Sequence, residues 1–372
     1  MFHNYKFKNL DIKLIIAVIA LTIIGIFVIG SANEANQQKQ ILGMILGIFV
    51  MTAMAIIDYD FLLHFHWVYY GLVIVLLVSV LLFGHESGGA TRWIEIVGIR
   101  FQPSELSKIL LILFFSWFFM IYEEDINKPK IIAITLILSA IPLFLIEEEP
   151  DLSTTIVTMM IICVMIFVTG ISYKLVGAVL GVSIPAIIIL LVLVSREGQT
   201  ILDEYQGMRI LAWLRPEEYP SSSYQQQNSI MAIGSGQLFG KGLGNEAFDS
   251  VKNGNYISEP HTDFIFAVAG EELGFLGSVL IIALIFFITI EILLIAKRAK
   301  DISGKLICVG MASLIGFQSF VNICVVTGLM PNTGLPLPFV SYGLTSLVTV
   351  YFGIGIVLNV GLQSKNNNGR LF

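Results

Sequence analysis

The chain has 372 residues, of which 56% are hydrophobic and only 13% are charged. Because ordinary soluble domains carry about 25% charged residues, this composition excludes most soluble folds. With a mean hydropathy of +0.85, the sequence predicts an integral membrane protein. The 27 Asp and Glu residues outnumber the 21 Lys and Arg residues, and the net charge of -6 leaves no basic field that would attract nucleic acid.

Ten apolar runs are candidates for membrane-spanning helices, each of which needs about 20 apolar residues. The runs begin near Leu14, Ile41, Trp67, Leu106, Ile131, Thr154, Leu175, Phe275, Leu306 and Val340. Lys and Arg are enriched in cytoplasmic loops. If the N-terminus lies inside, ten spans place most of the Lys and Arg residues on the cytoplasmic side and few in the short outer loops and helix mouths. The outer ones are Lys39, Arg92, Arg100 and Lys108. We therefore predict an all-α integral membrane fold of ten transmembrane helices, with both termini in the cytoplasm.

The segment from 196 to 262 is too long for a simple connection, since loops beyond about 12 to 15 residues are usually functional or disordered. We predict one large extracytoplasmic loop here, between spans seven and eight, in a single membrane domain that covers residues 1–372. The loop contains YQQQNSIMAIGSGQLFGKGLG, in which apolar residues alternate with a Gly-Ser-Gly turn. This pattern predicts partial folding at the membrane surface or a re-entrant segment, because irregular backbone at membrane depth must be buried in protein or line a cavity.

Two polar clusters precede predicted spans. Residues 88–108 place Glu105 and Lys108 one helical turn apart, a spacing that a plain interfacial ion pair explains as well as a functional pair does. Residues 147–155 place Asp151 directly before a span. On local grounds, the favoured role of this aspartate is to cap the helix that follows it.

Two further clusters lie later in the chain. Residues 259–274 place His261 and Asp263 at the outer mouth of the eighth predicted span. Residues 330–346 contain three prolines and two glycines, so they cannot form a regular helix, and hydroxyls such as that of Ser341 must find partners there. Broken helices of this kind usually line a cavity rather than lipid.

Basic residues accompany the acids on the predicted outer side. They are Arg92, Arg100, Lys108, Arg209, Arg215 and Lys241. Arg and Lys can hold phosphate oxygens while a carboxylate acts as general base, so this mixture suits an anionic ligand whose hydroxyl group must be deprotonated. Solvated loop charges would produce the same mixture, and composition alone leaves the choice open.

Six motifs occur in order along nearly the whole chain. They are FQPSELSK at 101–108, EPDL at 149–152, QGMRILAWLRPEE around Arg209, SYQQQNSIMAIGSGQLFGKG at 223–242, HTDFIFAVAGEELGFLG at 261–277 and TGLPLPFVSYG at 333–343. Together they resemble the SEDS family of bacterial cell-wall proteins, the group of RodA, FtsW and SpoVE. The last motif has Thr333 where division members tend to carry Lys, and so resembles the rod-shape (RodA) branch more closely.

The resemblance implies a peptidoglycan glycosyltransferase of the bacterial cytoplasmic membrane. Such an enzyme polymerises lipid II into glycan strands on the outer membrane face, here for cell-wall elongation and cell shape. The family's catalytic aspartate, in its HTDF motif, falls on Asp263. Asp263 would accept the proton of the acceptor sugar's 4-hydroxyl as that oxygen attacks the donor's anomeric carbon, with inversion and departure of a polyprenyl diphosphate.

The resemblance also implies a set of substrate-binding residues around this base. They are Arg92, Glu105, Lys108, Asp151, Arg209, Lys241, His261 and Ser341. The basic members would stabilise the charge that develops on the leaving diphosphate, Glu105 would orient Lys108, and Asp151 would support the cavity. A divalent cation, Mg or Mn, held by carboxylates could share this role, and no organic cofactor is expected.

A partner protein is implied as well, since the family works with a class B penicillin-binding transpeptidase that crosslinks the strands it makes. Lipid II, the growing glycan strand and membrane lipids complete the expected partners. Two other interpretations stay open, a flippase or transporter of the lipid-linked precursor and a division or sporulation member of the same family. A transporter would need essential charges near the membrane midplane, and the predicted spans are nearly free of them.

Overall fold

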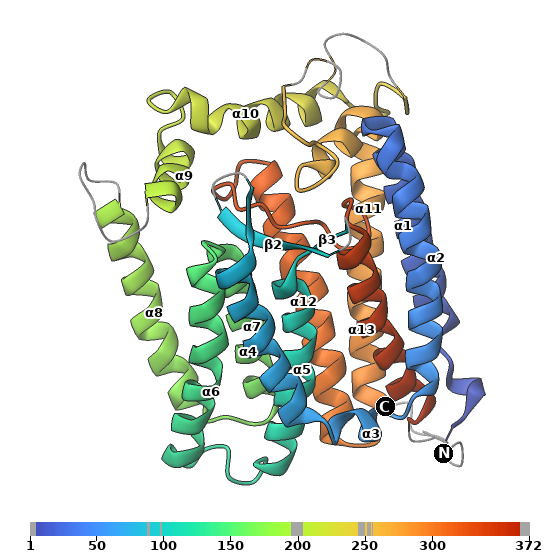
Figure 1. Ribbon diagram of the computed structural model, residues 1–372, viewed down its shortest axis with the longest axis vertical. Coiled ribbons are helices and arrows are strands. Elements are labelled where there is room, and N and C mark those ends of the chain that lie inside the picture. The colour runs from blue at the N-terminus through green and yellow to red at the C-terminus, as the bar shows by residue number, and fades with distance from the viewer. Residues whose placement is uncertain are drawn as a thin grey trace.

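The computed structural model describes residues 5–87, 90–96, 99–194, 204–244, 250, 254 and 256–364. Parts of the predicted outer loop, residues 196–203, 245–249, 251–253 and 255, therefore lie outside the described residues. The described chain is mostly helical, and its long helices stand side by side as a bundle (Figure 1). The start of α1 and the end of α13 lie at one end of this bundle, and α9 and α10 lie at the other.

The helices follow one another with short connections. In chain order they are a 3₁₀ turn at Phe7–Asn9, α1 Ile12–Ala32, α2 Glu34–Ile56, α3 Tyr59–Leu63, α4 His66–Phe83, α5 Pro103–Ile121, α6 Pro129–Glu148, α7 Leu152–Val168, α8 Tyr173–Val194, α9 Glu204–Leu214, α10 Pro220–Ser235, α11 Ile265–Arg298, α12 Ile302–Val326 and α13 Leu344–Leu362.

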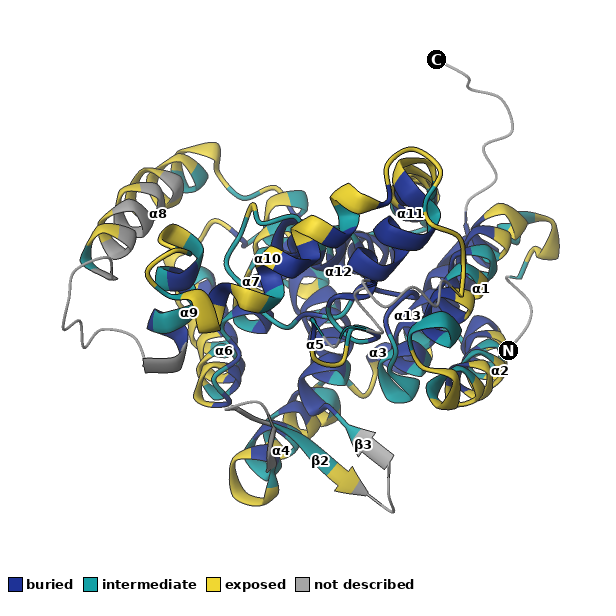
Figure 2. Ribbon diagram, turned by 90° about the horizontal axis from the view of Figure 1, so that it is seen from above, coloured by how far each residue is buried: buried dark blue, intermediate teal, exposed yellow. Residues whose placement is uncertain are grey.

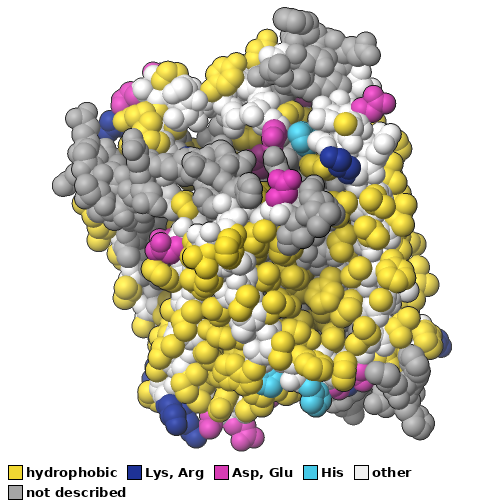
Figure 3. Space-filling view, in the orientation of Figure 1, with side chains coloured by type: hydrophobic (Ala, Val, Ile, Leu, Met, Phe, Trp, Pro, Cys, Tyr) yellow, Lys and Arg dark blue, Asp and Glu magenta, His cyan; other side chains and the backbone are white. Residues whose placement is uncertain are grey.

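Eight of the described helices are long and apolar enough to cross a membrane. They are α1, α2, α4, α5, α6, α11, α12 and α13. The apolar helix α7 is shorter, with 17 residues, and α8 has 22. Hydrophobic side chains form a broad band around the middle of the molecule, with charged side chains toward its two ends (Figure 3). The prediction of a multi-pass membrane protein is confirmed at this level.

The all-α prediction is wrong in one segment, which forms a small antiparallel sheet. Its strands are β1 His85–Ser87, β2 Ala90–Ile96 and β3 Ile99–Phe101, in the order β1-β2-β3. In the pairing of β2 with β3, Ile94 lies opposite Phe101 and Ile96 opposite Ile99. β2 contains Thr91, Trp93, Ile94 and Ile96, which are β-branched or aromatic residues of the types that favour strands. The sheet lies at the same end of the bundle as α9 and α10 (Figure 1).

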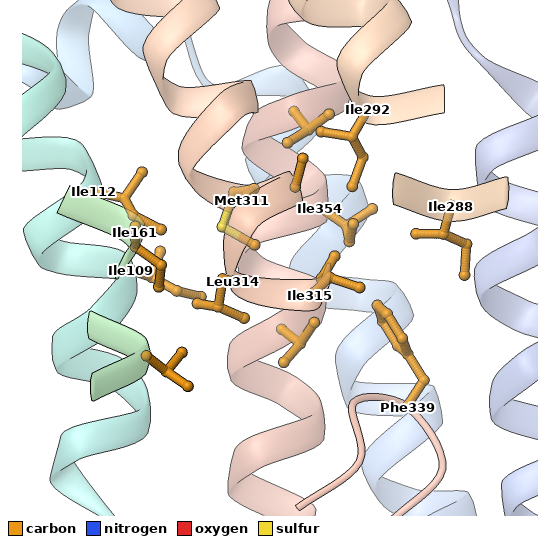
Figure 4. Packing of buried hydrophobic residues seen from close by; sticks show 14 of the residues in the cluster. Ile109, Ile112, Ile161, Ile288, Ile292, Met311, Leu314, Ile315, Phe339 and Ile354 are labelled. Carbon is orange, nitrogen blue, oxygen red and sulfur yellow. The ribbon is translucent and has the colours of Figure 1, made fainter. Parts of the chain in front are cut away.

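The centre of the bundle is formed by α5, α12 and α13. More than 70% of the most apolar stretch of each is buried, against less than 30% for α4 and α6 at the periphery, a contrast that Figure 2 shows from above. Branched and flexible side chains from four helices meet there, among them Ile112, Ile161, Met311 and Ile354 (Figure 4). Such dense packing makes α12 a rigid support for any side chain that it presents to a loop.

Helix α11 is broken near its start. Gly274 has non-helical dihedral angles (φ 67°), so that the long span begins at Phe275, as the sequence predicts, and a short helix from Ile265 precedes it. The break would leave backbone groups of α11 unpaired, but the segment after α10 supplies their hydrogen-bond partners. The Phe275 amide donates to the Gln237 carbonyl at 2.8 Å, and the Lys241 amide donates to the Glu271 carbonyl at 2.9 Å.

The last helix, α13, begins at Leu344 rather than near Val340. The preceding residues, 331–343, run as an irregular segment over the bundle end, as their prolines and glycines predict. We call residues 331–341 the proline loop. It lies against α12 and the start of α11, which brings two segments far apart in sequence, around 263 and around 334, to the same place.

Candidate active site

Asp263 lies in the turn immediately before α11, partly exposed at the end of the bundle. Its Oδ1 accepts a hydrogen bond from Thr262 Oγ1 at 2.9 Å. Removal from water raises the pKa of the Asp263 carboxyl above its usual range, while the Thr262 hydrogen bond and the charge of Arg209 act in the opposite direction. The carboxylate is therefore both held in place and more basic than an ordinary surface aspartate.

The proline loop leaves an open space beside this carboxylate. A Cβ atom built on Gly334 would lie 3.8 Å from Asp263 Oδ2 and 3.6 Å from Arg92 Nη1, so both atoms lie within 4 Å of one point. Gly334 also has a positive φ of 76°, a backbone conformation that residues with a side chain rarely adopt. Glycine at this position therefore keeps the gap between the carboxylate and the guanidinium free of protein atoms.

Arg92 reaches this gap from β2. Its guanidinium donates to the Glu149 carbonyl at 3.4 Å and to the Pro150 carbonyl, and its Nε lies 3.8 Å from Asp151 Oδ2. Asp151 also caps α7, accepting from the Thr154 amide at 3.1 Å. The favoured local role of Asp151 is confirmed, and the same carboxylate helps to orient Arg92.

Arg209 approaches from α9 on another side. Its Nη1 donates to the Asn332 carbonyl of the proline loop at 3.3 Å, and its charge is close enough to lower the pKa of Asp263. The helix is fixed by Trp213, whose indole nitrogen donates to the Gly328 carbonyl at 2.9 Å. Two guanidinium groups from separate elements thus surround one carboxylate.

Lys108 and Glu105 lie beneath this site rather than in it. Their ion pair measures 2.6 Å between Nζ and Oε1, and the side chain of Lys108 is fully buried. The ammonium also donates to Gln318 Oε1 at 2.7 Å, and Gln318 Nε2 in turn donates to the Pro336 carbonyl at 3.0 Å. The structure therefore places this pair as a support of the proline loop, with no exposed surface for a ligand.

Ser341 and His261 also join the two segments. Ser341 Oγ donates to the Thr262 carbonyl at 2.6 Å and accepts from the Leu337 amide at 2.7 Å. His261 is buried, its ring lies 5.3 Å from that of Tyr342, and burial lowers its pKa. A cavity of about 560 Å³ opens beside His261, between the 257–261 turn and the α1–α2 corner.

Lys241 lies farther along the same end of the bundle. Its ammonium pairs with Glu271 at 2.9 Å, beside the break in α11, and a quarter of its side chain is exposed. Of the predicted substrate-binding residues, Arg92 thus lies within 4 Å of the same point as the Asp263 carboxylate, and Arg209 is close enough for its charge to act on it. Glu105, Lys108, Asp151, His261 and Ser341 connect or support the segments around it, whereas Lys241 lies beside the break in α11.

Sequence reasoning missed two buried amides of α12, Gln318 and Asn322. Asn322 Nδ2 donates at 2.7 Å both to the Asp263 carbonyl and to the Leu335 carbonyl, and so links the base to the proline loop. The signal was present, since two amides one turn apart interrupt an otherwise apolar span and face the same side. The sequence reasoning also missed Glu149. The side chain of Glu149 is buried, and neither of its carboxylate oxygens has a hydrogen-bond partner among the described residues.

The described residues do not group the side chains that usually bind a metal ion in proteins. Within the described ranges, no three His, Cys, Asp or Glu side chains lie close enough together to hold one. A bound divalent cation would thus need ligands from its substrate as well as from carboxylates such as Asp263. The predicted Mg or Mn requirement stays a prediction.

The fold and the site define a multi-pass membrane protein with a charged site at one end of its bundle. The model of the cell cycle protein family of FtsW, RodA and SpoVE matches residues 9–366, and the chain belongs to this family. Peptidoglycan glycosyltransferase MrdB of Escherichia coli is 33% identical, with 96% of this chain and 95% of that protein covered. Probable peptidoglycan glycosyltransferase FtsW of Geobacter sulfurreducens is 32% identical, with 97% of both covered.

Two solved structures resemble this one over almost their whole length. A chain from a peptidoglycan synthase complex that coordinates polymerization and crosslinking has a TM-score of 0.77 and 28% identity, with 94% of this chain and 97% of that chain covered. The rod shape determining protein RodA of Thermus thermophilus has a TM-score of 0.68 and 25% identity, with 96% of this chain and 98% of that chain covered. The predicted family is therefore confirmed, and so is a mostly helical membrane fold like that of RodA, while the count of ten spans stays a prediction.

Proposed function

We propose that this protein is a peptidoglycan glycosyltransferase that polymerises lipid II, with Asp263 as its general base. The observation that carries the proposal is the placement of the Asp263 carboxylate and the Arg92 guanidinium within 4 Å of one open point above Gly334. A base beside a cation at a protein-free gap is what glycosyl transfer from a diphosphate donor requires. The names of the curated relatives support the same reaction.

The reaction can be followed through the residues of this site. Asp263 accepts the proton of the acceptor's 4-hydroxyl while that oxygen forms a bond to the donor's anomeric carbon, and the bond from this carbon to the diphosphate oxygen breaks on the opposite face. The raised pKa suits this role, because a general base works best when its pKa approaches the working pH.

The leaving diphosphate collects negative charge as it departs. Arg92 and Arg209 approach the gap from different elements and are both oriented by backbone carbonyls, so they can meet that charge without reorganising. Lys108 and Glu105 act beneath them through Gln318, and Lys241 lies farther out. A divalent cation would add to this stabilisation, and its contribution is tested by polymerisation with EDTA followed by Mg or Mn.

The family's membrane arrangement fits the described helices. We infer ten spans, with α7 and α8 added to the eight long apolar helices, because both are helical and apolar in sequence. The termini would then face the cytoplasm, and Asp263 with α9, α10 and the sheet would face outward. Reporter fusions at the α5–α6 and α9–α10 connections test this arrangement, which places the first connection inside and the second outside. Reporter signals that place both connections on the same side of the membrane would contradict it.

The partner and the cellular role are proposals of the same kind. A class B penicillin-binding transpeptidase is the proposed partner, supported by the resemblance to a chain of a peptidoglycan synthase complex. The proposed role is cell-wall elongation. Depleting the protein should give round cells if it acts in elongation and filaments if it acts in division.

The reaction is tested with lipid II and purified protein, with and without the candidate transpeptidase. Asp263→Asn should lower the polymerisation rate by at least about a hundredfold, the usual contribution of a general base. Glu218→Gln is the control, since it removes an exposed carboxylate that pairs only with Arg215 among the described residues. Undiminished polymer from Asp263→Asn would refute the proposal, and lipid II movement across vesicles without polymer would favour a flippase.

A further inference from the structure

A second charged cavity lies at the opposite end of α11 from Asp263. It has a volume of about 580 Å³ and is lined by residues at the beginning of α1 and the end of α11. Figure 1 shows these two helix ends at the end of the bundle opposite α10. Six charged side chains line it. They are Lys8, Lys13, Lys297, Arg298, Asp11 and Glu291. Neither the family motifs nor the reaction uses any of these residues.

The cations of this cavity are only partly neutralised. Arg298 Nη2 pairs with Asp11 Oδ2 at 3.3 Å, and Asp11 is also engaged as the cap of α1. Lys8, Lys13 and Lys297 have no carboxylate within ion-pair distance among the residues that the structure describes. Three exposed lysines therefore line this cavity with positive charge available to an anion.

Glu291 lies deeper in the same cavity. It precedes Arg298 by seven residues, which is about 10 Å along the helix, and only 8% of it is exposed. Glu291 lines the cavity, and no hydrogen bond or ion pair joins its carboxylate to another side chain among the described residues. An ionisable group within a membrane-spanning helix is costly and usually marks a functional site. A simple anion would be repelled here, so the ligand must also bring a hydrogen-bond donor.

The walls of the cavity continue into apolar surface. Ile12 and Ile16 on α1, and Leu293 and Leu294 on α11, are each at least 40% exposed beside its mouth. A ligand with an anionic group, a donor and an apolar tail would satisfy all three parts of the site. An anionic phospholipid whose headgroup carries hydroxyls has this chemistry.

We propose that this cavity binds one anionic phospholipid, of which phosphatidylglycerol is the model. Its phosphodiester lies among Lys8, Lys13 and Lys297, a headgroup hydroxyl donates to Glu291, and its acyl chains follow the exposed faces of α1 and α11. The site is separate from the glycosyl transfer machinery, so it stands whether or not the proposed reaction is correct.

The first test measures lipid retention by the full-length protein in neutral detergent, using native mass spectrometry with phosphatidylglycerol or phosphatidylcholine. Lys13→Gln with Lys297→Gln should weaken phosphatidylglycerol binding about 25-fold, since one juxtamembrane lysine contributes about fivefold on an anionic membrane. Lys130→Gln with Lys174→Gln is the control, because it removes two exposed lysines at the starts of α6 and α8 that make no ion pair among the described residues, and it should leave binding unchanged. Equal loss in both double variants, or equal retention of phosphatidylcholine, would overturn the proposal.

The second test concerns Glu291 and the source of the phosphate. Wild-type protein should prefer phosphatidylglycerol to phosphatidylmethanol, which has the same charge and no headgroup hydroxyl, by about tenfold. Glu291→Leu should remove that preference while the protein still folds, because leucine is well tolerated in a spanning helix. An unchanged preference would refute the role of Glu291. Displacement of the lipid by millimolar inorganic phosphate would show that the cavity serves free phosphate instead.

Discussion

Asn322→Ala is the change that most directly tests how the site is held together. Asn322 Nδ2 donates to the carbonyls of Asp263 and Leu335, both at 2.7 Å, and the residue is almost fully buried. Alanine would leave both carbonyls without this donor, and each buried unsatisfied acceptor costs roughly 1–3 kcal/mol. The turn that carries the base and the proline loop would then relax away from α12.

The loss should appear in the rate more than in folding. If displacement of the two loops raises the activation free energy of the reaction by about 2 kcal/mol, kcat falls about thirtyfold, because each 1.36 kcal/mol lowers the rate tenfold. The rest of α12 remains packed in the bundle centre, so the protein should still purify as a folded species. The assay is lipid II polymerisation under saturating substrate, with thermal unfolding measured in parallel.

Ser319→Ala provides the matched control on the same helix. Ser319 is as buried as Asn322, but its hydroxyl has no hydrogen-bond partner in the described part of the chain, so its removal takes no donor away from the proline loop or the Asp263 turn. It should therefore polymerise at the wild-type rate. The reasoning would be refuted if Asn322→Ala kept full activity, or if Ser319→Ala lost as much activity as Asn322→Ala.

Three further changes test separate parts of the structure. Gly334→Ala should lower polymerisation at least tenfold without unfolding the protein, because its methyl group would enter the gap between the two charged groups; Gly71→Ala, with nothing within 4 Å of its Cβ, is the control. Burial raises the pKa of Glu149 to about 9, so stability should fall as pH rises from about 4.5 toward 9, and Glu149→Gln should remove roughly 3 kcal/mol of that fall between about pH 6 and pH 8.5 in thermal unfolding measurements. Gly355→Ala should lower the unfolding temperature, with a cost of about 1–3 kcal/mol, because its Cβ would lie 2.5 Å from a backbone oxygen of α2.

The sequence predicts the membrane helices well because burial in lipid leaves a direct compositional signal. Every predicted span has a helix in the structure, and the start of the eighth at Phe275 coincides with the break at Gly274. The sheet at residues 85–101 was missed because its strands are short and lie in a charged, glycine-containing stretch that also reads as a loop. Nothing in that stretch reveals that Arg92 would point toward Asp263.

The position of Lys108 shows the limit of sequence reasoning about this site. The family resemblance predicts that Lys108 binds substrate, whereas the structure buries it against Gln318, 210 residues away. The partner of a buried lysine can be any distant amide or carboxylate, so its burial has no local signature. By contrast, the cap formed by Asp151 depends only on the next three residues and was predictable.

The buried lysine nevertheless explains why the proline loop is held in one orientation. A glutamine amide can present either its oxygen or its nitrogen to a neighbour. Lys108 can only donate, so it must face Gln318 Oε1, and Gln318 Nε2 is then directed to the Pro336 carbonyl. Glu105 in turn compensates the lysine charge within the bundle. The ion pair thus acts on the site by fixing the direction of the Gln318 amide, which lies four residues before the Asn322 amide that holds Asp263. A neutral side chain at position 108 would remove that constraint without touching Asp263.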